Sequence, residues 1–212
     1  MKLFIDSADL DEIRAAAALG VLDGVTTNPG LLAACDVPVA ELVPEICSIV
    51  DGPVSVPVRG DNRERIVEAG RAAARLHDNV VIKVPLHGDG LGAMSRLRSE
   101  GIRTHATLCC SASQALLAAR CGAWFVSPFV GRVDALGASG TELVAQIVDI
   151  YDNYEFDTQI MVASVRSVMH VQESALLGAD ACTMPLAVLE ELVRHPLTET
   201  LHAEYLADWT RS

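Results

Sequence analysis

Lysine is nearly absent from this chain of 212 residues, which contains two lysines against fourteen arginines. Acidic residues outnumber basic ones, and the net charge of −12 excludes the concentrated basic surface that nucleic acids require. The same charge gives no reason to expect affinity for an acidic membrane. No apolar run approaches the roughly 18 residues of a membrane span. We therefore expect neither a nucleic acid nor a membrane as a partner.

The sequence also lacks the cysteine spacings of a metal site or a redox pair. None of the cysteines forms a CxxC pair, and no histidine lies at zinc-finger spacing. We interpret all six as small buried hydrophobic residues in a reducing compartment. The beginning of the chain is too short and too soon acidic for a signal peptide, so we expect a cytoplasmic protein. The cysteines are Cys35, Cys47, Cys109, Cys110, Cys121 and Cys182.

Aromatic residues make up only 4% of the chain, so the core must be built from Ala, Val, Leu and Ile, a mixture typical of parallel strands covered by helices. Short β-branched runs alternate with amphipathic helical patterns, without a linker, which indicates one domain over 1–212. Eight such units favour a single (β/α)8 TIM barrel of the α/β class, and an open sheet is the alternative. We expect strands at 2–6, 23–27, 53–58, 80–84, 103–108, 123–127, 159–163 and 179–183, and helices at about 9–19, 38–50, 61–77, 90–99, 111–121, 140–152, 167–177 and 186–194.

The ends of these helices carry recognisable signals. Asp61 and Ser111 are plausible N-caps, and Gly20, Gly101, Gly122 and Gly178 follow helices where a C′ glycine belongs. A ninth helical pattern at about 197–210 has apolar residues at helical spacing. This extra C-terminal helix either caps its own barrel or docks on a neighbouring subunit.

Lys83 lies in an apolar, β-branched run, where a charged residue has no evident structural reason to be. Burying an ammonium costs several kcal/mol unless the group is paired or its pKa falls. A desolvated lysine titrates toward the neutral amine, which forms Schiff bases with carbonyl compounds. The alternative is a lysine at a strand end that extends its charged head into water.

Other polar residues lie near the ends of the expected strands, where the chemistry of such barrels is found. They include one carboxylate, several hydroxyls and three arginines, two of which form a plausible phosphate clamp with a serine. Each has an ordinary alternative explanation, such as a helix cap, a turn or a surface ion pair. Their convergence favours a phosphorylated carbonyl substrate. The residues are Asp6, Thr26, Asn28, Arg59, His105, Thr107, Ser127, Arg132, Ser164 and Arg166.

Apart from Arg59 and His105, these residues lie in segments that resemble the small transaldolase family, which includes the fructose 6-phosphate aldolases. The resemblance runs in order along essentially the whole chain. GVTTNP, VIKVP and VSPFVGRVD are specific in combination and weak singly. The matching segments are LFID at 3–6, GVTTNP at 24–29, VIKVP at 81–85, EGI at 100–102, ATL at 106–108, VSPFVGRVD at 126–134, VASVR at 162–166 and HPLT at 195–198.

The resemblance implies class I chemistry without a metal or an organic cofactor. Lys83 would form a Schiff base with a ketose phosphate, and Asp6 would take the C4 hydroxyl proton as the C3–C4 bond breaks. Asn28 would hold the dihydroxyacetone hydroxyls, and Thr107 would position a water for proton transfer. Arg132, Ser164 and Arg166 would bind the distal phosphate.

Phe129 matches the transaldolases, whereas the aldolases carry a tyrosine that helps to protonate the enamine. The resemblance therefore implies transfer of a dihydroxyacetone unit between sugar phosphates. It also implies a homo-oligomer, a pentamer or a decamer, with the C-terminal helix on a neighbouring subunit. Two other functions stay open: an aldolase that releases free dihydroxyacetone, and a non-catalytic barrel that binds sugar phosphates.

Strand 53–58 departs from the family, which has glutamate or glutamine at the position of Pro57. Proline has no proton to give and lacks a backbone N–H, so it is unusual inside a parallel strand. His105 lies two residues before Thr107, so both should face the barrel interior. In the family, that glutamate or glutamine positions a water for proton transfer together with the threonine matching Thr107. One hypothesis is that His105 takes over part of this role, and the alternative is that it only hydrogen-bonds a substrate hydroxyl or a strand neighbour. A housekeeping role in the pentose phosphate pathway is the simplest version of this function. Arg59 and His87 near the mouth, together with Pro57, make a specialised sugar pathway credible as well.

Overall fold

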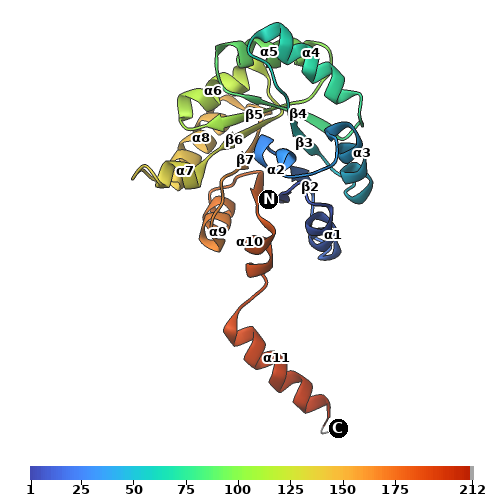
Figure 1. The fold of residues 1–212 in the computed structure, drawn as a ribbon. Helices are drawn as coiled ribbons and strands as arrows, with labels where there is room; N and C mark the ends of the chain where they lie inside the picture. The colour runs from blue at the N-terminus through green and yellow to red at the C-terminus, as the bar shows by residue number, and fades with distance from the viewer. Residues whose placement is uncertain (211–212) are drawn as a thin grey trace.

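The computed structural model describes residues 1–210 and shows a closed barrel of eight parallel strands (Figure 1). The strands pair in chain order, and the last strand closes the barrel on the first. This confirms the predicted (β/α)8 barrel and excludes the open sheet. The strands are β1 (Lys2–Asp6), β2 (Gly24–Thr26), β3 (Val54–Pro57), β4 (Val80–Pro85), β5 (Thr104–Cys109), β6 (Phe125–Pro128), β7 (Gln159–Val162) and β8 (Ala181–Met184).

Helices surround the barrel between successive strands (Figure 1). Eight of them match the expected ranges in place, with small differences at their ends. Two short helices, α2 (Pro29–Ala33) and α7 (Val130–Asp134), were not predicted, because five residues are too few to show a helical period. The others are α1 (Leu10–Ala18), α3 (Val39–Ile49), α4 (Arg63–Ala74), α5 (Gly88–Ser99), α6 (Ala112–Cys121), α8 (Gly140–Tyr154), α9 (Val168–Leu176), α10 (Leu186–Glu191) and α11 (Pro196–Trp209).

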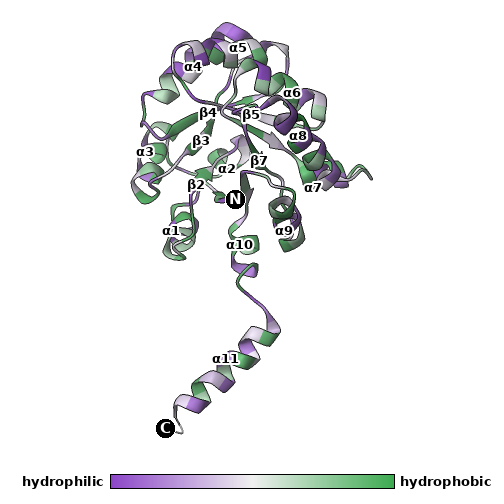
Figure 2. Cartoon of the chain, turned by 180° about the vertical axis from the view of Figure 1, so that it is seen from behind, coloured by the Kyte–Doolittle hydropathy of each residue, from purple (hydrophilic) through white to green (hydrophobic). Residues whose placement is uncertain are grey.

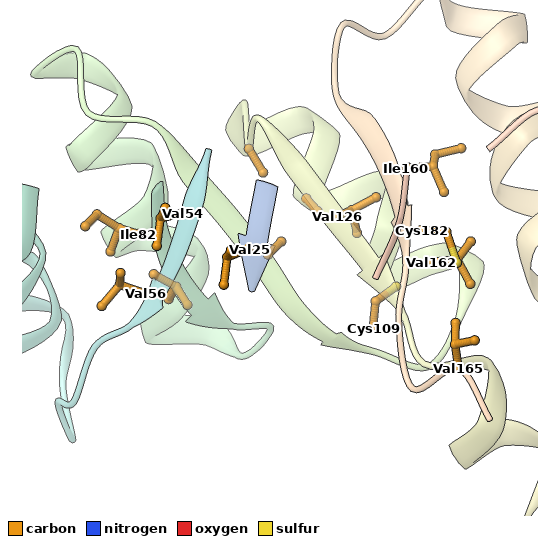
Figure 3. Packing of buried hydrophobic residues seen from close by; sticks show 14 of the residues in the cluster. Val25, Val54, Val56, Ile82, Cys109, Val126, Ile160, Val162, Val165 and Cys182 are labelled. Carbon is orange, nitrogen blue, oxygen red and sulfur yellow. The ribbon is translucent and has the colours of Figure 1, made fainter. Parts of the chain in front are cut away.

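Residues along each strand point alternately toward the helices and into the barrel. Most of the outward side chains are apolar and buried, as Val25, Val54 and Ile82 illustrate (Figure 3). Inside the barrel, Phe4 and Phe125 pack edge to face at 5.8 Å in a separate apolar cluster with residues of β4, β7 and β8. Further along the strands the inward positions become polar, so the fold itself gathers the chemically active side chains at one end.

The predicted helix ends are confirmed with one exception. Ser111 caps α6 through the N–H of Gln114, and the four glycines named above all have φ between +72° and +87°. The prediction for Asp61 was wrong, because the adjacent Asn62 caps α4 by accepting the N–H of Arg65. The carboxylate of Asp61 instead forms an ion pair with the Arg65 guanidinium at 2.9 Å.

The cysteines differ from the prediction at three positions. Cys109 and Cys182 are buried, and burial raises the pKa of each thiol to about 12. Cys110 is exposed, and Cys35 and Cys121 are only partly buried, so the expectation that all six are buried was wrong at these three positions. Between residues 1 and 210, no group of three or more His, Cys, Asp or Glu side chains is arranged to hold a metal ion.

Helix α11 extends away from the barrel rather than covering it (Figures 1 and 2). None of its residues is buried, and Leu201, Tyr205, Leu206 and Trp209 are each more than half exposed. The first alternative for this segment, that it caps its own barrel, is therefore wrong. Among the described residues, no helix is both long and apolar enough to cross a membrane.

Candidate active site

A cavity of about 400 Å³ opens at the carboxyl ends of the strands. Three of the four predicted catalytic residues line it: Asp6, Lys83 and Thr107. The predicted substrate-binding residues Asn28, Phe129, Arg132 and Ser164 line it as well. Larger cavities exist, such as one of about 520 Å³ between α4 and α5, but its lining offers no buried amine beside a carboxylate. The chemistry of the lining, rather than its size, identifies the candidate site.

Lys83 points into the barrel from β4 and is only 6% exposed. Its Nζ donates a hydrogen bond of 2.9 Å to the backbone carbonyl of Thr27. Burial lowers the pKa of the Lys83 ammonium, and the nearby charge of Asp6 partly opposes this by raising it. The alternative in which Lys83 extends its head into water is wrong. A larger share of this lysine is a neutral amine near neutral pH than of an exposed lysine.

The carboxylate of Asp6, at the end of β1, is held by two neighbours. The Thr26 hydroxyl donates to Oδ1 at 2.7 Å, and the Asn28 amide nitrogen donates to Oδ2 at 3.2 Å. Because Thr26 has only one proton, the hydroxyl of Thr183, 2.7 Å away, must donate to Thr26. Thr26 is buried and does not line the cavity, so it acts on the site through Asp6.

Asn28 is fixed by the short helix that it begins. Its Oδ1 caps α2 by accepting the N–H of Leu31 at 3.0 Å, so its amide nitrogen must face Asp6. Pro29 occupies the first position of that helix, where its missing N–H has no cost. The Asn28-Pro29 pair, which in sequence indicates only a turn, thus orients the amide that neighbours the carboxylate.

Thr107 lies where β5 departs from regular pairing. The register with β6 shifts between Ala106 and Cys109, and Leu108 has a left-handed φ of 61°. Such a bulge redirects the side chains beside it. Among the described residues, the buried Thr107 hydroxyl has no hydrogen-bonding partner, and it lines the cavity. It is therefore available to a substrate or a water.

His105 lies below the cavity and does not form part of its lining. Its Nδ1 is 2.6 Å from the Ser55 hydroxyl, and its Nε2 is 2.6 Å from the Ser127 hydroxyl. Burial, with a smaller contribution from the Lys83 charge, lowers the pKa of His105 well below its usual range. The ring is therefore neutral, and one of its nitrogens donates a hydrogen bond while the other accepts one. This arrangement agrees with the alternative hypothesis, in which His105 only hydrogen-bonds its neighbours. Ser127 shares this place below the cavity rather than in its lining.

The predicted phosphate clamp is built from α7 and the loop after β7. Ser164 has a left-handed φ of 59°, and its carbonyl accepts the N–H of Gly131 at 3.2 Å. A Cβ added at Gly131 would lie 2.9 Å from Arg166 Nε, so Arg166 passes directly over this glycine. Arg132 lines the cavity, and Arg166 is exposed beside it.

A side-chain link joins these two segments. Asp134 Oδ2, on α7, lies 2.9 Å from His170 Nε2, and His170 Nδ1 accepts the backbone N–H of Arg166. Since Nδ1 accepts, the ring proton must be on Nε2, where it is donated to Asp134. The carboxylate of Asp134 also accepts the N–H of Gly140. The link fixes the loop of Arg166 relative to the helix of Arg132.

Pro57 ends β3 directly across from Lys83 in the β3–β4 register and lines the cavity. Among the described residues that line this cavity, Asp6 is the one carboxylate. Arg59 does not line it, but joins His87 in an adjoining cavity of about 520 Å³ that shares Pro29, Pro57 and Pro85 with the first. His87 also caps α5, with Nδ1 accepting the N–H of Gly90.

Reasoning from the sequence missed three contributors: Thr183, the Asp134–His170 pair and the bulge at Leu108. Thr183 is the last residue of the expected strand 179–183, and its place at a strand end was a usable signal. The other two gave none, because a pair distant in sequence and a local register shift leave no pattern. Together, the site offers an amine nucleophile, a carboxylate base, an unengaged hydroxyl and two guanidinium groups.

Comparisons with known proteins agree with this geometry. Residues 3–211 match the model of the family described as transaldolase/fructose-6-phosphate aldolase. A probable transaldolase of Myxococcus xanthus is 51% identical over 212 residues, covering 100% of this chain and 95% of that protein. Probable transaldolases of Sorangium cellulosum (52% over 208 residues, 98% and 96%) and Aquifex aeolicus (51% over 211 residues, 100% and 97%) are similar as well.

Solved structures with low identity share the fold alone. A thiamine phosphate pyrophosphorylase from Pyrococcus furiosus aligns with a TM-score of 0.59 at 14% identity, covering 87% of this chain and 85% of that one. An inosine 5′-monophosphate dehydrogenase from Legionella pneumophila gives 0.59 at 14% identity, covering 89% and 58%. The family model matches nearly the whole length of this chain, and the relatives are about 50% identical to it. This chain therefore belongs to the transaldolase/fructose-6-phosphate aldolase family.

Proposed function

We propose that this protein is a transaldolase that moves a dihydroxyacetone unit from a ketose phosphate to an aldose phosphate through a Schiff base on Lys83. The observation that carries the proposal is the Lys83 amine, which is 6% exposed, has a lowered pKa and lies in one cavity with Asp6. A buried amine of this kind combines nucleophilicity with the ability to shed its proton. The family supports the reaction class, and the geometry supports the roles below.

In the first half of the reaction, the Lys83 lone pair attacks the ketone carbon of the donor. The carbonyl oxygen takes up protons and leaves as water, giving a protonated imine. Thr107, whose hydroxyl is unengaged, is the group that holds that water. The protonated imine withdraws electrons from the neighbouring bonds, which prepares the donor for cleavage without a further electron sink.

In the second half, Asp6 takes the proton of the donor's C4 hydroxyl. The C3–C4 bond breaks, its electron pair forms the enamine on Lys83, and an aldehyde leaves. The aldose phosphate then enters, the enamine carbon attacks its aldehyde, and Asp6 returns the proton. Hydrolysis of the new imine frees Lys83. Arg132, Ser164 and Arg166 bind the phosphate far from the reacting carbons, since guanidinium matches phosphate oxygens.

Phe129 bears on the choice between transfer and simple cleavage. It lines the cavity but has no hydroxyl with which to direct a water onto the enamine. An unprotonated enamine persists until an acceptor arrives, which favours transfer. The adjoining cavity contains Arg59 and His87, and it extends the site beyond Pro57, which lines both cavities. This extension supports an unusual acceptor from a specialised sugar pathway.

The assembly and the location of the enzyme follow the same reasoning. We propose a homo-oligomer, a pentamer or a decamer, in which α11 packs on a neighbouring subunit, because its large apolar side chains are exposed and cover none of its own barrel. We also propose a cytoplasmic location, because phosphorylated sugars are cytoplasmic substrates and all six cysteines are free thiols.

The experiment that tests the reaction supplies fructose 6-phosphate with and without a four-carbon aldose phosphate. We expect sedoheptulose 7-phosphate to form when the acceptor is present, and little free dihydroxyacetone to form when it is absent. Release of dihydroxyacetone at the same rate without an acceptor would instead identify an aldolase. Absence of both products would contradict catalysis with this donor and favour the non-catalytic sugar-phosphate barrel.

A further inference from the structure

Pro57 interrupts the hydrogen-bond ladder between β2 and β3. Their parallel register pairs Val25 with Val54 and Thr26 with Ser55, and the N–H of Thr27 donates to the Ser55 carbonyl at 2.9 Å. In a parallel ladder, alternate residues of one strand donate to the same neighbour. After Ser55, the next N–H directed at β2 belongs to position 57, and its acceptor would be the Thr27 carbonyl. Proline has no N–H, so the ladder leaves that carbonyl without its strand donor.

The Thr27 carbonyl is nevertheless hydrogen-bonded, because the Nζ of Lys83 donates to it at 2.9 Å. Lys83 stands directly across from Pro57 in the β3–β4 register, and both line the same cavity. A buried carbonyl without a partner is destabilising, so the amine satisfies a real requirement of the backbone. The lysine side chain thus occupies the place of the missing ladder donor.

We propose that Pro57 is a positioning residue, which holds the resting Lys83 amine against the Thr27 carbonyl by withholding the backbone N–H that would otherwise occupy that oxygen. A carbonyl oxygen stabilises an ammonium donor more than a neutral amine donor, so this contact favours the protonated, resting form. Attack on a substrate carbonyl requires the amine to leave this oxygen. The proposal rests on the proposed function for its meaning in catalysis, but it concerns the free enzyme and is testable without turnover.

Restoring the N–H at position 57 should release the lysine. In Pro57→Ala and Pro57→Val the backbone can donate to Thr27, and the two variants differ in side chain while sharing the donor. We expect the pKa of Lys83 to fall by about one unit in both variants, with about tenfold faster modification at neutral pH. The charged or titratable groups facing Lys83 are Asp6 on β1 and His105 on β5, with Arg132 from α7 in the same cavity, and the variants change none of them.

Pro85→Ala is the matched control. Pro85 also lines the cavity at a strand end, but the register of β3 and β4, in which the N–H of Val58 donates to the Lys83 carbonyl, directs the position 85 nitrogen toward Val58. This variant therefore loses a proline ring and gains an N–H without offering a donor to Thr27. Urea unfolding of all four proteins shows whether each variant is folded.

The measurement is competitive acetylation of the intact, substrate-free protein, read by mass spectrometry between pH 6 and 11. The chain has only two lysines, so the exposed Lys2 is the internal standard for Lys83. We expect the midpoint for Lys83 to fall in both Pro57 variants and to stay in place in Pro85→Ala. Unchanged midpoints in the Pro57 variants, or an equal shift in Pro85→Ala, would overturn the proposal. The proposed reaction fails separately, by the absence of a trapped sugar on Lys83 while these midpoints still shift.

Discussion

Replacing His105 by asparagine should change the pH dependence of stability and leave Schiff-base formation intact. His105 is fully buried, and its two ring nitrogens each lie 2.6 Å from a serine hydroxyl. It also lies outside the lining of the cavity. Asparagine is shorter than histidine, so it can bridge Ser55 and Ser127 only in part. The structure therefore predicts a structural role for this side chain.

The magnitude follows from burial and from the lowered pKa of His105. At pH 7, one buried hydroxyl without its partner should cost about 1–3 kcal/mol. The pKa of the folded-state imidazole lies below its unfolded value near 6.5, so its stabilising effect is complete above that pH and is lost as the pH falls. Each pH unit below 6.5 is worth at most about 1.4 kcal/mol, so the loss between pH 6.5 and pH 5 is at most about 2 kcal/mol.

The assay is urea unfolding at pH 7 and pH 5, at fixed protein concentration, for the unsubstituted protein and for His105→Asn. The unsubstituted protein should lose more stability than the variant, by up to about 2 kcal/mol, because contributions that both proteins share cancel in the difference. His202→Asn, which changes an exposed histidine of α11, is the control and should keep the full loss.

Two results would refute this reasoning about His105. One is an equal pH-dependent loss in His105→Asn and the unsubstituted protein, which would mean that the ring does not stay neutral. The other is a folded variant in which the rate of Schiff-base formation falls by about 10²–10⁴-fold, the usual value of general acid–base catalysis. That outcome would restore the hypothesis that His105 handles water.

Three further predictions concern the phosphate clamp and the C-terminal helix. Arg132→Ala and Arg166→Ala should each raise the KM for the phosphorylated donor fructose 6-phosphate at least tenfold and leave that for unphosphorylated fructose unchanged. Steady-state kinetics with an equal effect on both donors would contradict a phosphate role. Gly131→Ala should destabilise the protein by about 1–3 kcal/mol and raise the KM for the phosphorylated donor, because the added methyl group would contact Ser164 and Arg166 too closely. An unchanged urea midpoint would show that the loop after β7 moves without cost. Deleting residues 196–212 should leave the barrel folded and lower the mass in light scattering, whereas an unchanged mass would mean that α11 makes no subunit contact.

The barrel was predictable because its signal is repeated eight times. Each β-branched run and each amphipathic pattern is weak, but their alternation leaves few architectures. Their positions near the ends of the expected strands then placed Asp6, Lys83 and Thr107 together, and all three line the cavity. The pattern could not distinguish His105 and Ser127 from the residues that line the cavity. All of them point into the barrel, and only their depth along its axis decides whether they reach the cavity.

What the sequence could not supply depends on single distances. Asp61 and Asn62 are equally good caps on paper, and only the backbone decides which side chain reaches the Arg65 N–H. The link between Asp134 and His170 joins helices α7 and α9 across 36 positions of chain, and no local pattern marks it. Pro57 was visible as a departure, but its consequence for Thr27 emerges only from the strand register.

The most direct test of the central claim is borohydride trapping with fructose 6-phosphate, followed by peptide mass spectrometry, with Lys83→Met as the control. The account predicts a reduced three-carbon adduct on Lys83 and none in the control, which would establish imine formation and cleavage together. A six-carbon adduct would mean that the imine forms but cleavage stalls. No adduct on Lys83, with this donor or with sedoheptulose 7-phosphate, would contradict the account.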